Sequence, residues 1–220
     1  MSVKAVLFDF DGTLADTAPD LGGALNLLLR RYGKPDVPLS RSRPLVSMGA
    51  RGMLQIGFSM KPHHAEYEAM KAEYLTLYEE NLCCETRLFN GMPQVLDTLE
   101  SRAIPWGIVT NKHSRFTTPL LTALNISQRV SCVVTGDTVA NLKPDPEGLF
   151  AAAKQLNLLP SKNIVYVGDD ERDIQAALAA NMTAVAANYG YLGNNNPPTQ
   201  WGARWAIDSP LDLLKYLPNN

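Results

Sequence analysis

The sequence has little cysteine, almost no net charge and no long apolar run. Its three cysteines, Cys83, Cys84 and Cys132, form no even disulfide framework and show no zinc-site spacing. We expect all three to be buried as small hydrophobic side chains. Twenty Lys and Arg against twenty-two Asp and Glu give a net charge of −2. This balance excludes a general electrostatic attraction to nucleic acid or to an acidic membrane surface.

Nothing in the sequence predicts membrane attachment. No stretch approaches the roughly 20 apolar residues that a membrane span needs. The apolar run at residues 5–8 is too short for a signal peptide and is followed at once by acidic residues. We therefore expect a cytoplasmic protein. Its 220 residues suffice for one domain and a smaller accessory one.

Short, continuously apolar runs alternate with helical patterns along most of the chain. Continuous apolar character is typical of strands that are buried on both faces of a parallel sheet. The runs occupy residues 3–8, 105–110, 130–135, 163–167, 183–188 and, more weakly, 204–207. Their alternation with helices, among them one with its apolar positions at Leu149, Phe150, Ala153 and Leu156, predicts a doubly wound α/β fold.

The interval between the first two predicted strands is too long for a normal crossover connection. It has no strand-like run but two helical patterns, and their apolar positions are Leu21, Leu25, Leu28, Leu29 and Tyr67, Met70, Tyr74, Leu77. We therefore predict a helical insert over residues 16–87, and a core formed by residues 1–15 and 88–220.

Four polar motifs stand at the ends of predicted strands or at a helix entrance. They are Asp9-Phe10-Asp11-Gly12-Thr13, Thr110-Asn111, Lys143-Pro144-Asp145 and Gly168-Asp169-Asp170-Glu171-Arg172-Asp173. Taken alone, the first is an ordinary turn and the second an ordinary helix cap. Ligands of open α/β sheets, however, bind beyond the carboxyl ends of the strands, and the motifs converge on that edge.

In type and order, the four motifs resemble those of haloacid dehalogenase-like phosphatases, and the resemblance covers essentially the whole chain. It implies a Rossmann-like doubly wound core with a small helical cap of the C1 type, which closes over the site. It also implies that Asp9 is a nucleophile that forms an aspartyl-phosphate. Asp11 would act first as an acid toward the leaving group and then as a base toward water.

The same resemblance implies a magnesium site, because an anionic nucleophile and an anionic phosphate repel each other without a cation between them. The implied ligands are the Asp9 side chain, the Asp11 backbone carbonyl and Asp169. Asp173 would orient this site from outside, and Asp170 is left open between the two roles. The phosphate would be held by Thr110, Asn111 and Lys143.

The segment Gly49-Ala50-Arg51-Gly52 interrupts a helical pattern within the predicted cap. It is either an ordinary turn with a solvated arginine or a specificity loop, in which Arg51 reaches toward a substrate carboxylate. Residues 106–112 and 189–203 resemble phosphoglycolate phosphatase-like enzymes, including the branch that acts on N-acetylmuramic acid 6-phosphate. The predicted substrate is therefore a small acidic phosphometabolite, either 2-phosphoglycolate or N-acetylmuramic acid 6-phosphate, hydrolysed by a monomer or a homodimer.

Other functions are compatible with parts of this pattern. A β-phosphoglucomutase-like mutase shares the four motifs and differs mainly in its cap. A dehalogenase is disfavoured, because it does not need the acid and base that Asp11 supplies. A non-catalytic binding module predicts the loss of at least one motif, and all four are present.

Overall fold

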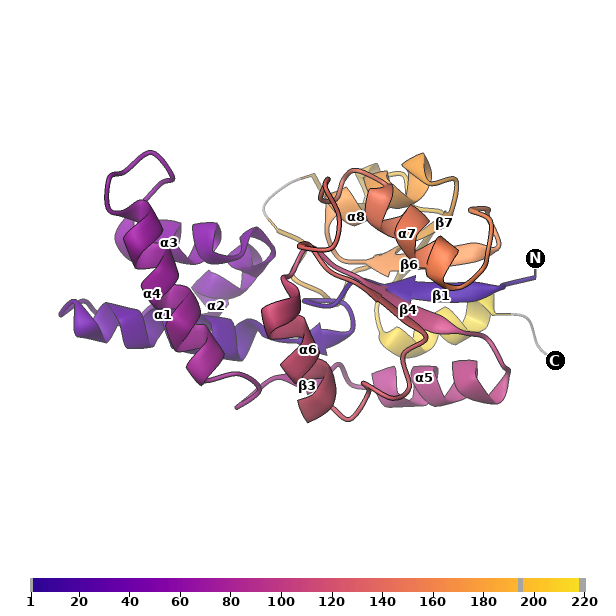
Figure 1. Cartoon of the computed structure of the whole chain (residues 1–220), viewed down its shortest axis with the longest axis horizontal. Helices are drawn as coiled ribbons and strands as arrows, with labels where there is room; N and C mark the ends of the chain where they lie inside the picture. Colours follow the sequence, from indigo (N-terminus) through magenta and orange to yellow (C-terminus); the bar gives the residue numbers. More distant parts are fainter. Residues whose placement is uncertain (1, 194–195, 218–220) are drawn as a thin grey trace.

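The computed structural model describes residues 2–193 and 196–217 and contains two lobes (Figure 1). The larger lobe holds a parallel sheet, and the smaller one consists of helices from the first half of the chain. The strands of the main sheet are β1 (Ala5–Phe8), β4 (Trp106–Val109), β5 (Cys132–Val134), β6 (Ile164–Gly168), β7 (Thr183–Ala187) and β8 (Trp205–Ile207). The helices of the larger lobe are α5 (Met92–Ser101), α6 (Ser114–Ala123), α7 (Glu147–Gln155), α8 (Glu171–Ala179) and the 3₁₀ segments η2 (Pro198–Gln200) and η3 (Pro210–Tyr216).

The six strands pair in the order β5-β4-β1-β6-β7-β8, and every pair is parallel. In register, Phe8 of β1 lies between Ile108 of β4 and Val167 of β6. The chain builds outward from β1 in one direction through β4 and β5, and in the other through β6, β7 and β8. The carboxyl end of β1 therefore lies at the topological switch point, where such sheets bind ligands. The α/β prediction is confirmed.

Helices cover both faces of this sheet, which explains why its strands are continuously apolar. Residues of α5, α6 and η3 pack on one face against side chains such as Phe8 and Trp106, both fully or almost fully buried. Residues of α7 and α8 pack on the other face against side chains such as Leu7 and Tyr166. The strands β1, β4, β5, β6 and β7 thus contribute to both cores, whereas the edge strand β8 contributes to the first alone.

The smaller lobe is built by part of the chain between β1 and α5. It contains α1 (Ala18–Arg31), α2 (Leu39–Ser42), the 3₁₀ helix η1 (Arg43–Met48), α3 (Ala50–Phe58) and α4 (Tyr67–Glu80). The predicted stripes of α1 and α4 meet in a separate core that includes Leu25, Leu28 and Tyr74. The prediction of a helical insert is therefore confirmed. Within the described residues, no helix combines the length and the hydropathy of a membrane span.

Outside residues 49–52, three details of the sequence prediction are wrong. The insert was predicted to have no strand, yet β2 (Ala15–Asp16) and β3 (Arg87–Leu88) form a short antiparallel pair where the chain enters and leaves it. Strands of two residues are too short to produce an alternating pattern. Phe150 of α7 is 42% exposed rather than buried, and Cys84 is exposed as well.

Candidate active site

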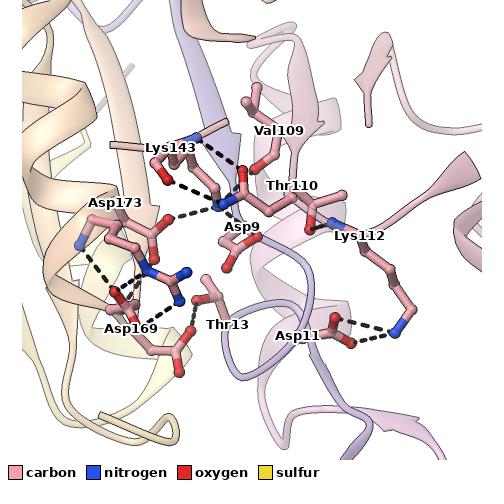
Figure 2. A network of polar contacts seen from close by, with 12 residues as sticks. Asp9, Asp11, Thr13, Val109, Thr110, Lys112, Lys143, Asp169 and Asp173 are labelled. Carbon is pink, nitrogen blue, oxygen red and sulfur yellow. Dashed lines mark hydrogen bonds and ion pairs between the residues drawn. The ribbon is translucent and has the colours of Figure 1, made fainter. Parts of the chain in front are cut away.

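The carboxyl ends of three neighbouring strands bring polar side chains to the edge of the sheet that faces the helical lobe (Figure 1). Asp9 follows β1, Thr110 follows β4 and Asp169 follows β6. The strands are parallel and adjacent, so these residues converge, and Figure 2 shows them around Lys143. The convergence predicted from the four motifs is present in the structure.

Lys143 is the cation at the centre of this cluster. Its Nζ lies 2.9 Å from Asp9 Oδ1 and 2.6 Å from Asp173 Oδ1, and the side chain is 6% exposed. It also donates to the Tyr166 hydroxyl at 2.9 Å. Burial opposes its charge, but the carboxylates of Asp173 and Asp9 raise the pKa of Lys143 above its ordinary value. Lys143 is therefore held as an ammonium ion beside Asp9.

Asp169 is fully buried and is held by two donors. Thr13 Oγ1 donates to its Oδ1 and the Tyr191 backbone N–H to its Oδ2, both at 2.8 Å. Burial, followed by the charge of Asp9, raises the pKa of Asp169 well above its ordinary value. Gly12 leaves room for this carboxylate, because a Cβ on Gly12 would lie 2.2 Å from Asp169 Oδ2, and its φ is +85°.

The cluster fits a divalent cation. Asp9, Asp169 and Asp173 each place one carboxylate oxygen within 4.8 Å of the others. Against these three carboxyl groups, Lys143 supplies one positive charge. Asp9 Oδ1 is buried, and in the described part of the chain it has no partner in hydrogen-bond geometry besides this ion pair. A set of carboxylate oxygens with excess negative charge suits a hard ion such as Mg²⁺.

Asp170 and Asp173 are already engaged by the protein. Asp173 Oδ1 pairs with Lys143, and its Oδ2 accepts from the Asp170 backbone N–H at 3.0 Å. Asp170 accepts from Arg172 through both of its oxygens, and the two aspartates form a capping box at the start of α8. This arrangement supports an orienting role for both. Asp170 lies outside the cluster of three carboxylates.

Asp11 has its carboxylate turned away from Asp9 and toward Lys112 (Figure 2). Lys112 Nζ lies 3.1 Å from both of its oxygens, and Thr17 Oγ1 donates to Oδ1 at 2.5 Å. Lys112 directly follows the Thr110-Asn111 motif but was not singled out by sequence reasoning. Its adjacency to that motif was the available signal.

The two residues of the second motif differ in their contacts. Thr110 is 5% exposed, and its Oγ1 accepts from the Lys112 backbone N–H at 3.3 Å. The Asn111 side-chain amide binds the backbone of Lys143. Its Oδ1 accepts from the Lys143 backbone N–H at 3.0 Å, and its Nδ2 donates to the Lys143 backbone carbonyl at 3.2 Å. Asn111 therefore fixes the backbone that carries the central ammonium.

A cleft of about 500 Å³ opens above this cluster, between the two lobes. Its floor includes Asp9, Asp11 and Lys143, and its helical side includes Ser47, Tyr74 and Tyr78. The Arg172 guanidinium donates to the Ser47 carbonyl at 2.8 Å, which joins α8 to η1 across the cleft. The cleft therefore has a charged floor and a partly aromatic wall.

Arg51 does not line this cleft. It is an exposed residue in the first turn of α3, beside a separate hollow lined by Gln55, Lys61 and His63 among others. The predicted loop at residues 49–52 is wrong, because only Gly49, with φ +59°, lies outside α3. Gly52 instead permits close packing, since its Cβ would lie 2.4 Å from the Leu45 carbonyl oxygen.

Tyr191 connects the carboxylate cluster to the helical lobe. Its backbone N–H holds Asp169, while its hydroxyl accepts from the backbone N–H groups of Thr17 and Ala18 at 2.8 and 2.9 Å. These donors belong to the start of α1, where the Thr17 side chain makes no capping bond and Asp16 Oδ1 accepts from the Ala18 N–H only at 3.4 Å. A tyrosine distant in the sequence thus supplies a hydrogen-bond acceptor for backbone N–H groups at the start of the insert.

We expect Tyr191→Phe to lower the free energy of unfolding by about 1–3 kcal/mol, because the buried Thr17 N–H loses its acceptor and the Ala18 N–H keeps only Asp16 Oδ1, at 3.4 Å. Urea denaturation measures this change. Tyr32→Phe is the matched control: its hydroxyl donates to Glu73 at an exposed site, so its loss should change stability by less than about 0.5 kcal/mol. Equal effects of the two variants would contradict the capping role.

The model of the haloacid dehalogenase-like hydrolase family matches residues 6–187. The chain therefore belongs to this family. It is 40% identical over 217 residues to an N-acetylmuramic acid 6-phosphate phosphatase of Pseudomonas putida, covering 99% of this chain and 97% of that protein. It is 41% identical over 210 residues to a phosphoglycolate phosphatase of Xanthomonas campestris, covering 96% and 94% of the two chains.

A solved structure from Haemophilus somnus, described as a predicted phosphoglycolate phosphatase, is similar throughout. It superposes with a TM-score of 0.87 at 28% identity and covers 98% of both chains. The similarity includes the helical insert as well as the sheet, because a match of this extent leaves neither lobe out.

Proposed function

We propose that this protein is a magnesium-dependent phosphomonoesterase that acts on a small acidic phosphometabolite through an aspartyl-phosphate on Asp9. The observation that carries the proposal is the position of Asp9. Its carboxylate lies at the switch point of the sheet, on the floor of a cleft, with Lys143 2.9 Å away and Asp169 in the same cluster. Relatives over nearly the whole length are named phosphatases.

In the first half of the proposed reaction, an Asp9 oxygen attacks phosphorus and the ester P–O bond breaks. Asp11 gives a proton to the leaving oxygen. In the second half, Asp11 takes a proton from a water molecule, which attacks phosphorus and releases inorganic phosphate and free Asp9. Lys143 and the Thr110 hydroxyl stabilise charge on the phosphoryl oxygens.

The Asp9 and Asp169 carboxylates and the Asp11 backbone carbonyl would hold the magnesium ion, with Asp173 and Asp170 orienting the site. Bound there, Mg²⁺ supplies the positive charge that lets one anion approach another. The excess of carboxylate over ammonium in the buried cluster supports this assignment.

The cleft favours the larger of the two candidate substrates. Its volume of about 500 Å³ lies within the range of about 300–1,000 Å³ that is usual for pockets holding drug-sized ligands. A two-carbon phosphoglycolate fills little of such a space, whereas a phosphorylated amino sugar with a lactyl group fills much more. We therefore propose N-acetylmuramic acid 6-phosphate ahead of 2-phosphoglycolate.

The test is a phosphate-release assay on both compounds and on p-nitrophenyl phosphate, with Mg²⁺ and with excess EDTA. We expect release from all three with Mg²⁺, fastest from the amino sugar, and loss of activity in EDTA that Mg²⁺ restores. Full activity in excess EDTA would contradict the metal assignment. Retention of phosphate on a sugar, without release, would favour the mutase instead.

A further inference from the structure

Lys112 differs from the other cations that line the cleft. The other three long basic side chains outside the carboxylate cluster are paired with acids other than the proposed nucleophile and the proposed acid: Lys71 with Glu68, Arg115 with Glu79, and Arg172 with Asp170. Lys112, by contrast, pairs with Asp11, the proposed acid. Within residues 2–193 and 196–217, no other carboxylate is paired with it.

The position of Lys112 is well defined. Its backbone N–H donates to Thr110 Oγ1, and its carbonyl accepts from the Gly136 N–H at 3.0 Å. The side chain is 7% exposed, and its Nζ lies 4.8 Å from the centre of the Tyr78 ring. The ammonium group is therefore fixed between the phosphate-binding edge and the wall of the cleft, where the leaving group of a substrate must lie.

The ion pair with Lys112 holds the Asp11 carboxylate away from the place where it would transfer a proton to the leaving oxygen. Lys112 contacts both Asp11 oxygens, and Thr17 donates to one of them. Figure 2 shows that the carboxylate points away from Asp9, where the ester bond would break. Asp11 reaches a leaving oxygen only after its ion pair with Lys112 breaks. Because the Lys112 ammonium group is buried, it then needs another anion as a partner.

We propose that Lys112 exchanges partners when substrate binds, leaving Asp11 for a carboxylate on the leaving group and so releasing Asp11 to take a proton from solvent and carry it to the leaving oxygen. This inference rests on the proposed function. It assigns recognition of the substrate's acid to a core residue instead of Arg51, which lies outside the cleft. A substrate without a carboxylate leaves Lys112 on Asp11, so recognition affects turnover as well as binding.

Two pairs of compounds isolate the carboxylate. N-acetylglucosamine 6-phosphate lacks only the lactyl group of N-acetylmuramic acid 6-phosphate, and ethyl phosphate has a methyl group where 2-phosphoglycolate has its carboxylate. With Lys112→Met, we expect kcat/KM on the acidic member of the hydrolysed pair to fall by roughly 10- to 100-fold, the usual effect of losing a hydrogen bond to a charged group. On the neutral member, kcat/KM should stay the same or rise.

The ratio of kcat/KM between the two members decides the inference. A ratio that falls less than about tenfold in Lys112→Met overturns it, as does a carboxylate-specific loss in Arg51→Met with none in Lys112→Met. Lys112→Arg, which keeps the charge, should restore most of the ratio, and Lys112→Gln replaces the methionine variant if that variant does not fold. Failure of the wild type to hydrolyse any of the compounds would overturn the proposed function itself, which is a different result.

Binding measurements test the exchange without turnover. In Asp9→Asn, calorimetry should show that Lys112→Met weakens binding of the acidic phosphate ester and leaves the neutral ester nearly unchanged. In the Asp9→Asn protein with Lys112 present, the additional change Asp11→Asn removes the resting partner of Lys112. It should then tighten binding of the acidic ester more than that of the neutral one. Equal changes for both esters would show that Lys112 does not change partner.

Discussion

Asp9→Asn should lower turnover by more than about a thousandfold while the fold stays intact. The amide has nearly the same shape as the carboxylate but is not a nucleophile toward phosphorus, so the first step of the proposed reaction is lost. Phosphate release with Mg²⁺ measures the effect, and circular dichroism and urea denaturation check the fold. Beryllofluoride should bind at Asp9 in the wild type and not in the variant.

Asp145→Asn is a suitable control for this change. Asp145 belongs to the same set of motifs, but its Oδ1 accepts from the Glu147 backbone N–H at an exposed helix start. We expect its turnover to stay within about threefold of wild type. Turnover within tenfold of wild type in Asp9→Asn would remove the covalent mechanism proposed here.

Asp169→Ala should raise the Mg²⁺ concentration needed for half-maximal activity by tenfold or more, because an oxygen ligand is lost. A second measurement does not depend on activity. Saturating Mg²⁺ should stabilise the wild type against unfolding by about 2.7 kcal/mol at 100 times the dissociation constant. The variant should gain much less at the same concentration.

The stability of Asp169→Ala without metal is also informative. Burial and the charge of Asp9 raise the pKa of Asp169, so its ionised form opposes folding at neutral pH when no cation is bound. Removing this carboxylate should therefore cost little stability in EDTA, although Thr13 and Tyr191 lose an acceptor. Equal stabilisation of both proteins by Mg²⁺ would show that Asp169 is not a ligand.

The sequence by itself determined the layout of the α/β lobe. Strands such as residues 5–8 and 164–168 are buried on both faces, so nearly every position is apolar and the run is visible without a partner. The stripes of α1 and α4 were visible for a different local reason, since each helix buries one face and its apolar residues recur at helical spacing. The four motifs were recognisable because the polar residues of each lie within a few consecutive positions.

Local pattern also misled in places. Two glycines around Arg51 predicted a loop, but Gly52 is a helical residue whose missing side chain lets α3 pack against η1. The strands β2 and β3 are two residues each, and their pairing of Ala15 with Leu88 is a tertiary contact. Neither feature has a periodicity that a sequence window could detect.

Only the tertiary structure decided which partners the site residues have. Tyr191 reaches across 174 positions to the start of α1 while its backbone holds Asp169. Lys112 is an ordinary lysine in the sequence, and only the approach of β1 to β4 places it on Asp11, 101 positions away. The physical reason is that strand and helix formation depend on neighbours along the chain, whereas the charge, burial and partners of a side chain depend on what the fold brings beside it.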